Sequence, residues 1–285
     1  MKGAKISQSA GFWASRIAIL IIIGILGYIL FYIISNGAGV ISWEFLTQPP
    51  THGMTSGGIF PAIVGTLLLV VLAIVVALPF GLMAAIYLVE YSSNESRFFR
   101  WVNSAVNNLN GVPSIVFGLF GLAFFAKFLG FGVCLLSASL TLAMMILPTV
   151  IVTSVEALRS VPNSFREGSM ALGASKWQTI SRVVLPAAFP GIITGSILGV
   201  GRAAGETAPI LFTGAVYYMR GLPGSVFDPV MALPYHLFVL STEHPNISAV
   251  RPIQFGTALV LILLVLSISL VAAFIRYRYR KMRKW

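Results

Sequence analysis

The chain has 285 residues, of which 57% are hydrophobic and only 9% are charged. A soluble domain carries about 25% charged residues, so the composition excludes an ordinary soluble protein and indicates a membrane protein. The net charge of +11 would suggest nucleic-acid binding in a soluble chain, but the placement of these charges gives a different explanation.

Six segments are apolar and long enough to cross a bilayer as helices, for which about 20 residues suffice. All are too long for membrane strands and lack an alternating pattern, which excludes a membrane β-barrel. The sequence therefore predicts an all-α integral membrane protein with six transmembrane helices in a single domain over residues 1–285. The segments are about 17–34, 60–89, 112–129, 135–155, 187–216 and 255–275.

The basic residues are concentrated in alternate loops of this arrangement. Most of the 19 lysines and arginines lie in the N-terminus, the 90–101 loop, the 156–186 loop or the C-terminus. Because cytoplasmic loops of membrane proteins are enriched in these residues, both termini and the 156–186 loop are expected in the cytoplasm. The charge thus orients the chain in a lipid bilayer, and no nucleic-acid partner is expected. The exceptions are Lys127, Arg202, Arg220 and Arg251.

The polar stretch 166–186, between two apolar segments, has more internal structure than a simple connector needs. Gly173 is suited to a left-handed turn that ends one helix, and Ser175 with Gln178 forms a capping box that begins the next. The pattern predicts two short helices with a sharp corner, a shape suited to binding by another protein. No Gly-Lys dipeptide occurs, so the chain has no Walker phosphate loop, and any ATP must be hydrolysed by a partner.

The fifth apolar segment carries two charges, Arg202 and Glu206, each of which costs about 3 kcal/mol at the bilayer centre. Two interpretations remain open. They form a structural ion pair, or Arg202 offers its forked donors to a passing oxyanion while Glu206 holds the arginine between passages or accepts a proton from the substrate. The same arc of this helix carries small residues that favour close helix packing, namely Ala187, Gly191, Gly195, Gly199 and Ala203.

The loops on the outer side carry three histidines, His52, His236 and His244, at spacings that suit no metal site. They are expected to be solvated or structural residues. The sequence offers no catalytic residue and no cofactor motif, so an enzyme is not expected. The second outer loop, 217–254, contains a short apolar run, Met231–Leu240, which is interpreted as a lid or an interfacial helix.

The stretch 167–186 resembles the coupling loop of the membrane subunits of binding-protein-dependent ABC importers. That family has Glu-Ala-Ala, three residues, Gly, nine residues and Ile-x-Leu-Pro, and the spacing is intact here. Gly168 and Ser169 replace the alanines, and Val183 replaces the isoleucine. The resemblance implies that an ATPase is engaged through the matching residues, which are Glu167, Gly173, Leu185 and Pro186.

Three further stretches, 57–66, 111–118 and 202–209, resemble the PstA-type permeases of the phosphate branch. The resemblance covers a permease core of about residues 57–275, with the coupling loop at 156–186. It implies a type I importer permease fold in the cytoplasmic membrane of a bacterium or an archaeon. Arg202 and Glu206 match charged residues implicated in phosphate passage.

The same resemblance implies partner chains. These would be a second, PstC-like permease, a pair of PstB-like ATPase subunits and an external PstS-like phosphate-binding protein. One arginine does not select among oxyanions, so phosphonate, sulfate or molybdate remain alternative cargoes. An ion-coupled secondary carrier is a further alternative, although such carriers usually need more intramembrane carboxylates than Glu206 alone.

Overall fold

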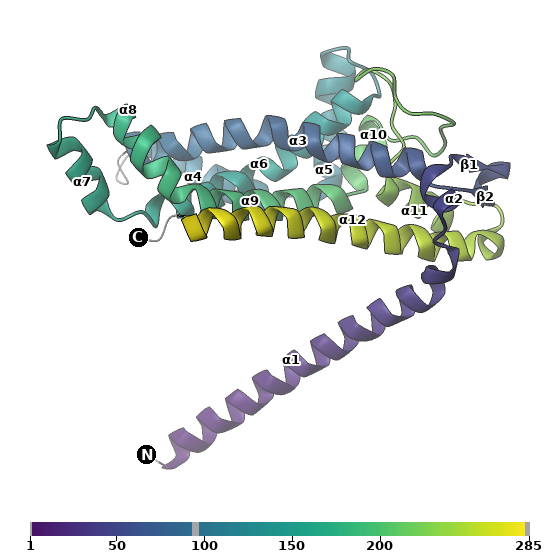
Figure 1. Ribbon diagram of the computed structural model, residues 1–285, viewed down its shortest axis with the longest axis horizontal. Coiled ribbons are helices and arrows are strands. Elements are labelled where there is room, and N and C mark those ends of the chain that lie inside the picture. Colours follow the sequence, from purple (N-terminus) through teal and green to yellow (C-terminus); the bar gives the residue numbers. More distant parts are fainter. Residues whose placement is uncertain (1, 93–96, 283–285) are drawn as a thin grey trace.

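In the computed structural model, which describes residues 2–92 and 97–282, five helices are long and apolar enough to cross a membrane (Figure 1). Their positions confirm the predicted α-helical membrane fold. They are α1 (Lys2–Gly37), α3 (Phe60–Ile86) with the π-helical turn η3 (Tyr87–Tyr91), α6 (Leu135–Arg159), α12 (Ile247–Met282), and one continuous helix formed by α8 (Lys176–Thr179), η5 (Ile180–Val184) and α9 (Leu185–Gly205).

The predicted third span begins at a sharp bend. It consists of α5 (Ser114–Gly121) and the π-helical segment η4 (Leu122–Phe128), and it lies at 103° to the preceding α4 (Arg97–Asn110). The corner follows from Pro113, which has an extended ψ of 140° and no N–H with which to continue a helix. The described residues reach six spans only when this bent pair counts as one.

The predicted fifth span is interrupted as well. Helix α9 ends at Gly205, Glu206 is extended, and α10 (Ala208–Thr213) follows. The expectation of one helix over 187–216 is wrong, because Pro209 cannot donate the hydrogen bond that would join its turn to the carbonyl of Gly205. The two interrupted spans pack together closely, since a Cβ on Gly118 of α5 would lie 2.8 Å from the Ala208 carbonyl oxygen.

The small residues of α9 pack against α6, as the sequence predicts. A Cβ on Gly191 would lie 2.6 Å from the Ala157 Cβ, and one on Gly195 would overlap the Thr153 side chain. Without side chains at these points, the two helices approach closely enough for van der Waals contact along their length. Helix α3 packs beside both, and the core of the bundle lies between α3, α6 and α9.

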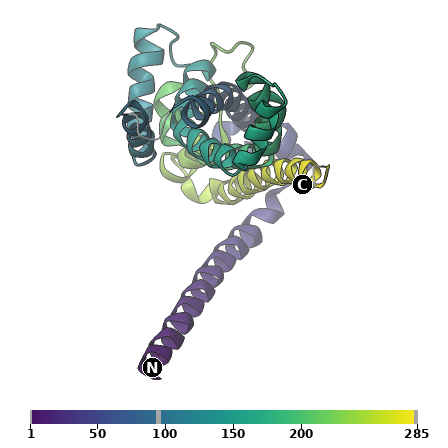
Figure 2. The same ribbon diagram turned by 90° about the vertical axis from the view of Figure 1, so that its left-hand side faces the viewer.

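Helix α1 leaves the bundle at an angle (Figure 2). The most apolar stretch of α1 is unburied, and near its C-terminal end α1 contacts α12, where the ring centroids of Tyr32 and Phe255 lie 5.4 Å apart. Short elements follow it along the chain at that end of the bundle. They are η1 (Ala38–Val40), α2 (Trp43–Thr47), η2 (His52–Met54) and the antiparallel strands β1 (Pro50–Thr51) and β2 (Ser56–Gly57).

The loop 217–254 folds into the bundle. The interpretation of its apolar run as a lid is wrong, because Met231, Leu233 and Leu240 are fully buried. The Leu233 N–H donates a 2.8 Å hydrogen bond to the buried Thr66 hydroxyl of α3. Helix α11 (Leu233–Thr242) therefore belongs to the core.

The three histidines have structural surroundings. His52 shares a 2.8 Å hydrogen bond with Ser56, and His244 bonds the Gly53 carbonyl oxygen at 2.8 Å. His236, on α11 outside the long apolar helices, is 1% exposed, and burial lowers its pKa to about 4.

We expect the protein to lose stability as the pH falls from about 6.5 towards about 4. In the unfolded chain His236 takes up a proton at its ordinary pKa of 6.5, whereas burial keeps it neutral in the folded chain down to about 4. Protons therefore favour the unfolded state, by up to about 3 kcal/mol. Thermal unfolding in detergent at about pH 7.5 and about pH 5 should show a smaller pH effect in His236→Phe. Equal pH effects in both proteins would contradict this.

Candidate coupling and translocation site

The segment 160–184 between α6 and α9, which we call the elbow, has the predicted corner. Helix α7 (Asn163–Ala171) ends before Gly173, whose φ of +84° is in the left-handed region. Both hydrogen bonds of the capping box are present between Ser175 and Gln178, at 2.8 Å and 3.3 Å. The second helix of the elbow is longer than predicted, because α8 continues through η5 into α9. A displacement of the elbow would thus act directly on the fifth span.

The structure divides the four predicted coupling residues into two pairs. Glu167 and Gly173 are exposed on the elbow. Leu185 and Pro186 lie at the start of α9 and line an apolar groove of about 400 Å³ with Leu78 of α3. The first pair is accessible to a partner, whereas the second pair attaches the elbow to the bundle.

The tip of the elbow also exposes apolar side chains that the sequence analysis missed. Leu172 is 91% exposed, and Met170 and Trp177 are exposed beside it. Large apolar groups in an otherwise polar loop are typical of a contact with another protein. Their position next to Gly173 in the sequence was the signal that could have revealed them.

Arg202 and Glu206 form a loose pair at the interruption between α9 and α10. One contact of 3.4 Å joins the arginine Nε to the Glu206 carboxylate, and the two side chains are 34% and 20% exposed. Within the described part of the chain, the guanidinium makes no other hydrogen bond. Its two terminal nitrogens are therefore available to a ligand.

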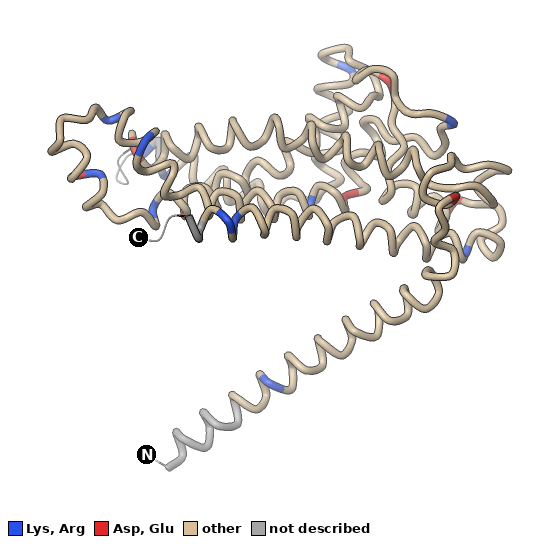
Figure 3. The backbone as a smooth tube through the Cα atoms, in the orientation of Figure 1, with Lys and Arg blue, Asp and Glu red and all other residues tan. Residues whose placement is uncertain are grey.

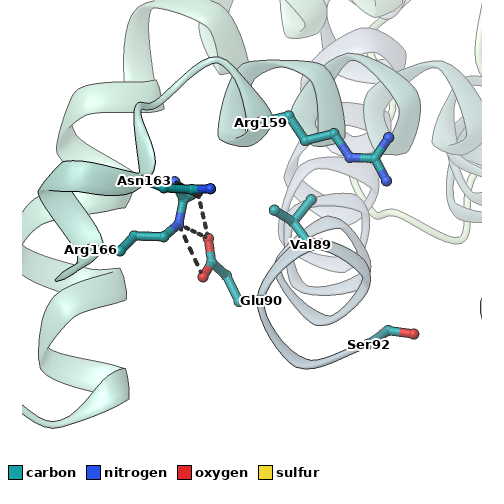
Figure 4. Close-up of a pocket in the computed structure, with 6 residues that line it drawn as sticks. All are labelled: Val89, Glu90, Ser92, Arg159, Asn163 and Arg166. Carbon is teal, nitrogen blue, oxygen red and sulfur yellow. Dashed lines mark hydrogen bonds and ion pairs between the residues drawn. The ribbon is translucent and has the colours of Figure 1, made fainter. Parts of the chain in front are cut away.

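A second arginine pair lies where the elbow meets the bundle (Figure 4). The Arg166 guanidinium binds Glu90 at 2.8 Å, and both side chains are largely buried, at 14% and 8% exposed. They line a polar pocket of about 410 Å³ with Arg159 and Asn163. No group of histidine, cysteine or acidic residues among the described ones is arranged to hold a metal ion.

A helical membrane bundle with an exposed elbow and a loosely held arginine at a helix interruption has the features of a transporter subunit. The chain belongs to the family of binding-protein-dependent transport system inner membrane components, which matches residues 77–284. It is thus a multi-pass membrane permease subunit and not an enzyme.

Named relatives cover most of the chain. Phosphate transport system permease protein PstA 1 of Mycobacterium tuberculosis is 37% identical over 262 residues, which are 90% of this chain and 83% of the relative. Phosphate transport system permease protein PstA of Mycobacterium leprae is 41% identical over 223 residues, 78% of this chain and 71% of the relative.

A solved structure has the same fold. A chain of a bacterial alginate ABC transporter in complex with an alginate pentasaccharide-bound periplasmic protein is 15% identical and covers 96% of each chain, with a TM-score of 0.68. The architecture is therefore that of a type I ABC importer permease.

Proposed function

We propose that this chain is a permease subunit of an ATP-driven phosphate importer, forms half of its translocation path and couples that path to a separate ATPase. The observation that carries the proposal is the Arg202 guanidinium, which among the described residues has a single 3.4 Å contact with Glu206 and two terminal nitrogens free for an oxyanion. A structural ion pair would be expected to hold more of these donors, so the geometry favours a ligand-facing role. The 37% and 41% identical relatives support phosphate as the cargo.

The interrupted helices support a path beside this arginine. Non-helical backbone at membrane depth is tolerated where it is buried in protein or lines a water-filled cavity. This chain has two such points, at 111–113 and at 206–207, on spans that pack against each other. Such a region provides polar groups that can face a hydrated path.

The proposed assembly contains a PstC-like second permease, a pair of PstB-like ATPase subunits and a PstS-like binding protein. Helix α1 projects from the bundle and would provide contact area for the second permease. The exposed elbow residues Glu167 and Gly173 would meet the ATPase, and Leu185 and Pro186 would carry its movement into α9.

We place the elbow and both termini in the cytoplasm of a bacterial or archaeal cell, with residues 57–275 as the permease core and 156–186 as its coupling loop. Figure 3 supports this orientation, because Lys and Arg gather at the end of the bundle that carries α7 and α8. Such a bias is typical of cytoplasmic ends.

The test is uptake by the reconstituted complex of this chain with its second permease, ATPase pair and binding protein. We expect accumulation of labelled phosphate in proteoliposomes that requires ATP, the ATPase and the binding protein. Faster uptake of sulfate, molybdate or phosphonate would assign another oxyanion, for which Arg202 is chemically suited as well. Uptake without the ATPase and ATP would replace the proposal by a secondary carrier.

We expect Gly173→Ala to weaken ATPase binding about fivefold to thirtyfold, because left-handed backbone costs an L-residue about 1–2 kcal/mol. The matched control is Gly168→Ala on the same elbow, where a Cβ meets open space and φ is ordinary. Co-purification of the ATPase with each variant measures the effect. Equal recovery with both variants would show that the corner is not needed for docking.

A further inference from the structure

Helix α7 carries the proposed ATPase contact but contributes no buried residue to the bundle. Phe165 packs partly buried against the core cluster that includes Leu158 and Ile180, and individual side-chain bonds add to this attachment. One is a 2.9 Å hydrogen bond between Ser169 and Thr179, which joins α7 to the helix that continues into α9. The other is the Arg166 cluster.

The groups that accept hydrogen bonds from the Arg166 guanidinium lie on separate parts of the chain. Nε and Nη2 bind the Glu90 carboxylate, with distances from 2.8 to 3.4 Å. Nη2 also donates to the Leu158 carbonyl oxygen at 2.9 Å, and Nη1 donates to that of Val161 at 2.7 Å. Nη1 reaches Asn163 at 3.4 Å as well. We call Arg166 and Glu90 the elbow clamp.

The elbow clamp joins segments that are distant in sequence. Glu90 lies on η3 at the end of α3, 76 residues before Arg166 on α7. Leu158 lies in the last turn of α6, where the negative end of the helix dipole favours a cation. One side chain thus fastens the elbow to the second and fourth spans. The fourth span is also joined to α7 by a short loop, whereas the second span has no direct covalent connection to the elbow.

The burial of the elbow clamp makes it a firm connection. Its two side chains are 14% and 8% exposed, against 34% and 20% for Arg202 and Glu206. A forked arginine–carboxylate contact shielded from water resists both salt screening and rotation of the side chain. Breaking one partner leaves the other charge buried without compensation.

We propose that the elbow clamp positions α7 so that displacement of the elbow moves α3 together with α9. The proposal rests on the proposed function of α7 as the ATPase contact. With the clamp intact, the elbow acts on both spans as one body. Without it, α7 still binds the ATPase but turns about its bonds to α8, and ATP hydrolysis is no longer matched by transport.

The first variant is Glu90→Gln, which keeps the shape and one acceptor but removes the charge. We expect normal co-purification of the ATPase, continued ATP hydrolysis, and a fall of about fivefold or more in phosphate transported per ATP. The matched control is Glu156→Gln, an exposed carboxylate of α6 outside the clamp, which should keep the wild-type ratio.

A chemical rescue separates positioning from a general loss of structure. Cys134 is the only cysteine, and Cys134→Ser provides the background for Glu90→Cys. The adjoining pocket of about 410 Å³ has room for a thiol reagent (Figure 4). A methanethiosulfonate that adds a carboxylate should restore the transport ratio, whereas a similar reagent that adds a quaternary ammonium should not.

An unchanged ratio of transport to hydrolysis in Glu90→Gln would overturn the elbow clamp as a coupling device. Parallel loss of ATPase co-purification and both activities, without rescue by either reagent, would also overturn it and leave the pair a structural role. If the wild-type complex itself fails to import phosphate, the proposed function fails. That outcome is distinct, because the clamp concerns only variants of a working complex.

Discussion

Arg202→Gln is expected to lower ATP-dependent phosphate uptake by about tenfold to a hundredfold, while the permease assembles normally. A hydrogen bond to a charged partner contributes about 1.5–3 kcal/mol, and glutamine keeps a donor but neither the charge nor the fork. Because the guanidinium makes one 3.4 Å contact within the described chain, its removal leaves little unsatisfied in the resting fold. The loss should therefore appear in transport rather than in thermal stability.

Three matched variants distinguish a substrate contact from a structural ion pair. Arg202→Lys keeps the positive charge but replaces the forked guanidinium by a compact ammonium group, and it should retain part of the uptake. Glu206→Gln should affect uptake less than Arg202→Gln, since the carboxylate would hold the arginine only between passages. Arg220→Gln, an exposed arginine of the loop 217–254, should behave as wild type. Equal uptake in Arg202→Gln and wild type would reduce the pair to a structural role.

The elbow was predictable because its signals lie close together in the sequence. Gly173 determines the corner, and Ser175 with Gln178 determines the start of the next helix, through bonds between neighbours. The close packing of the small residues of α9 was predictable for a similar reason, because residues at every fourth position of a regular helix lie on nearly the same face. Local rules therefore identified the corner of the elbow and the packing face of α9.

The interruptions were harder to predict because apolar composition continues across them. Pro113 and Pro209 were visible, but a proline near a helix start is ordinary and does not show that a span is broken. The breaks are stabilised by tertiary packing, because α5 and α10 cross closely at Gly118. Hydropathy alone thus predicted the number of spans better than their shape.

The elbow clamp could not be predicted from the sequence. Its partners are 76 residues apart, and the chain contains several carboxylates that Arg166 might have met on charge alone. The carbonyls of Leu158 and Val161 complete the cluster, and backbone acceptors carry no sequence signal. The connection between the elbow and α3 is therefore visible only in the folded structure.

The close packing of α6 and α9 leads to a further prediction, for Gly195→Ala. The added methyl group would overlap the Thr153 side chain, whose hydroxyl is held by a 2.8 Å bond to the Thr149 carbonyl oxygen. The helices must then separate, which should destabilise the protein by about 1–3 kcal/mol. Lower thermal unfolding temperature and less monodisperse protein in detergent would report this change.

Gly201→Ala is the matched control on the same helix, because its methyl group would lie 4.0 Å from the nearest atom, Val265 Cγ1. It should be as stable as wild type, although it adds the same atoms within two turns of Gly195. Separation of α9 from α6 would also move Arg202, so Gly195→Ala should lose phosphate uptake even in the fraction that folds. If both variants unfold at the wild-type temperature, α6 accommodates the methyl group, and the absence of a side chain at Gly195 is not what sets the helix spacing.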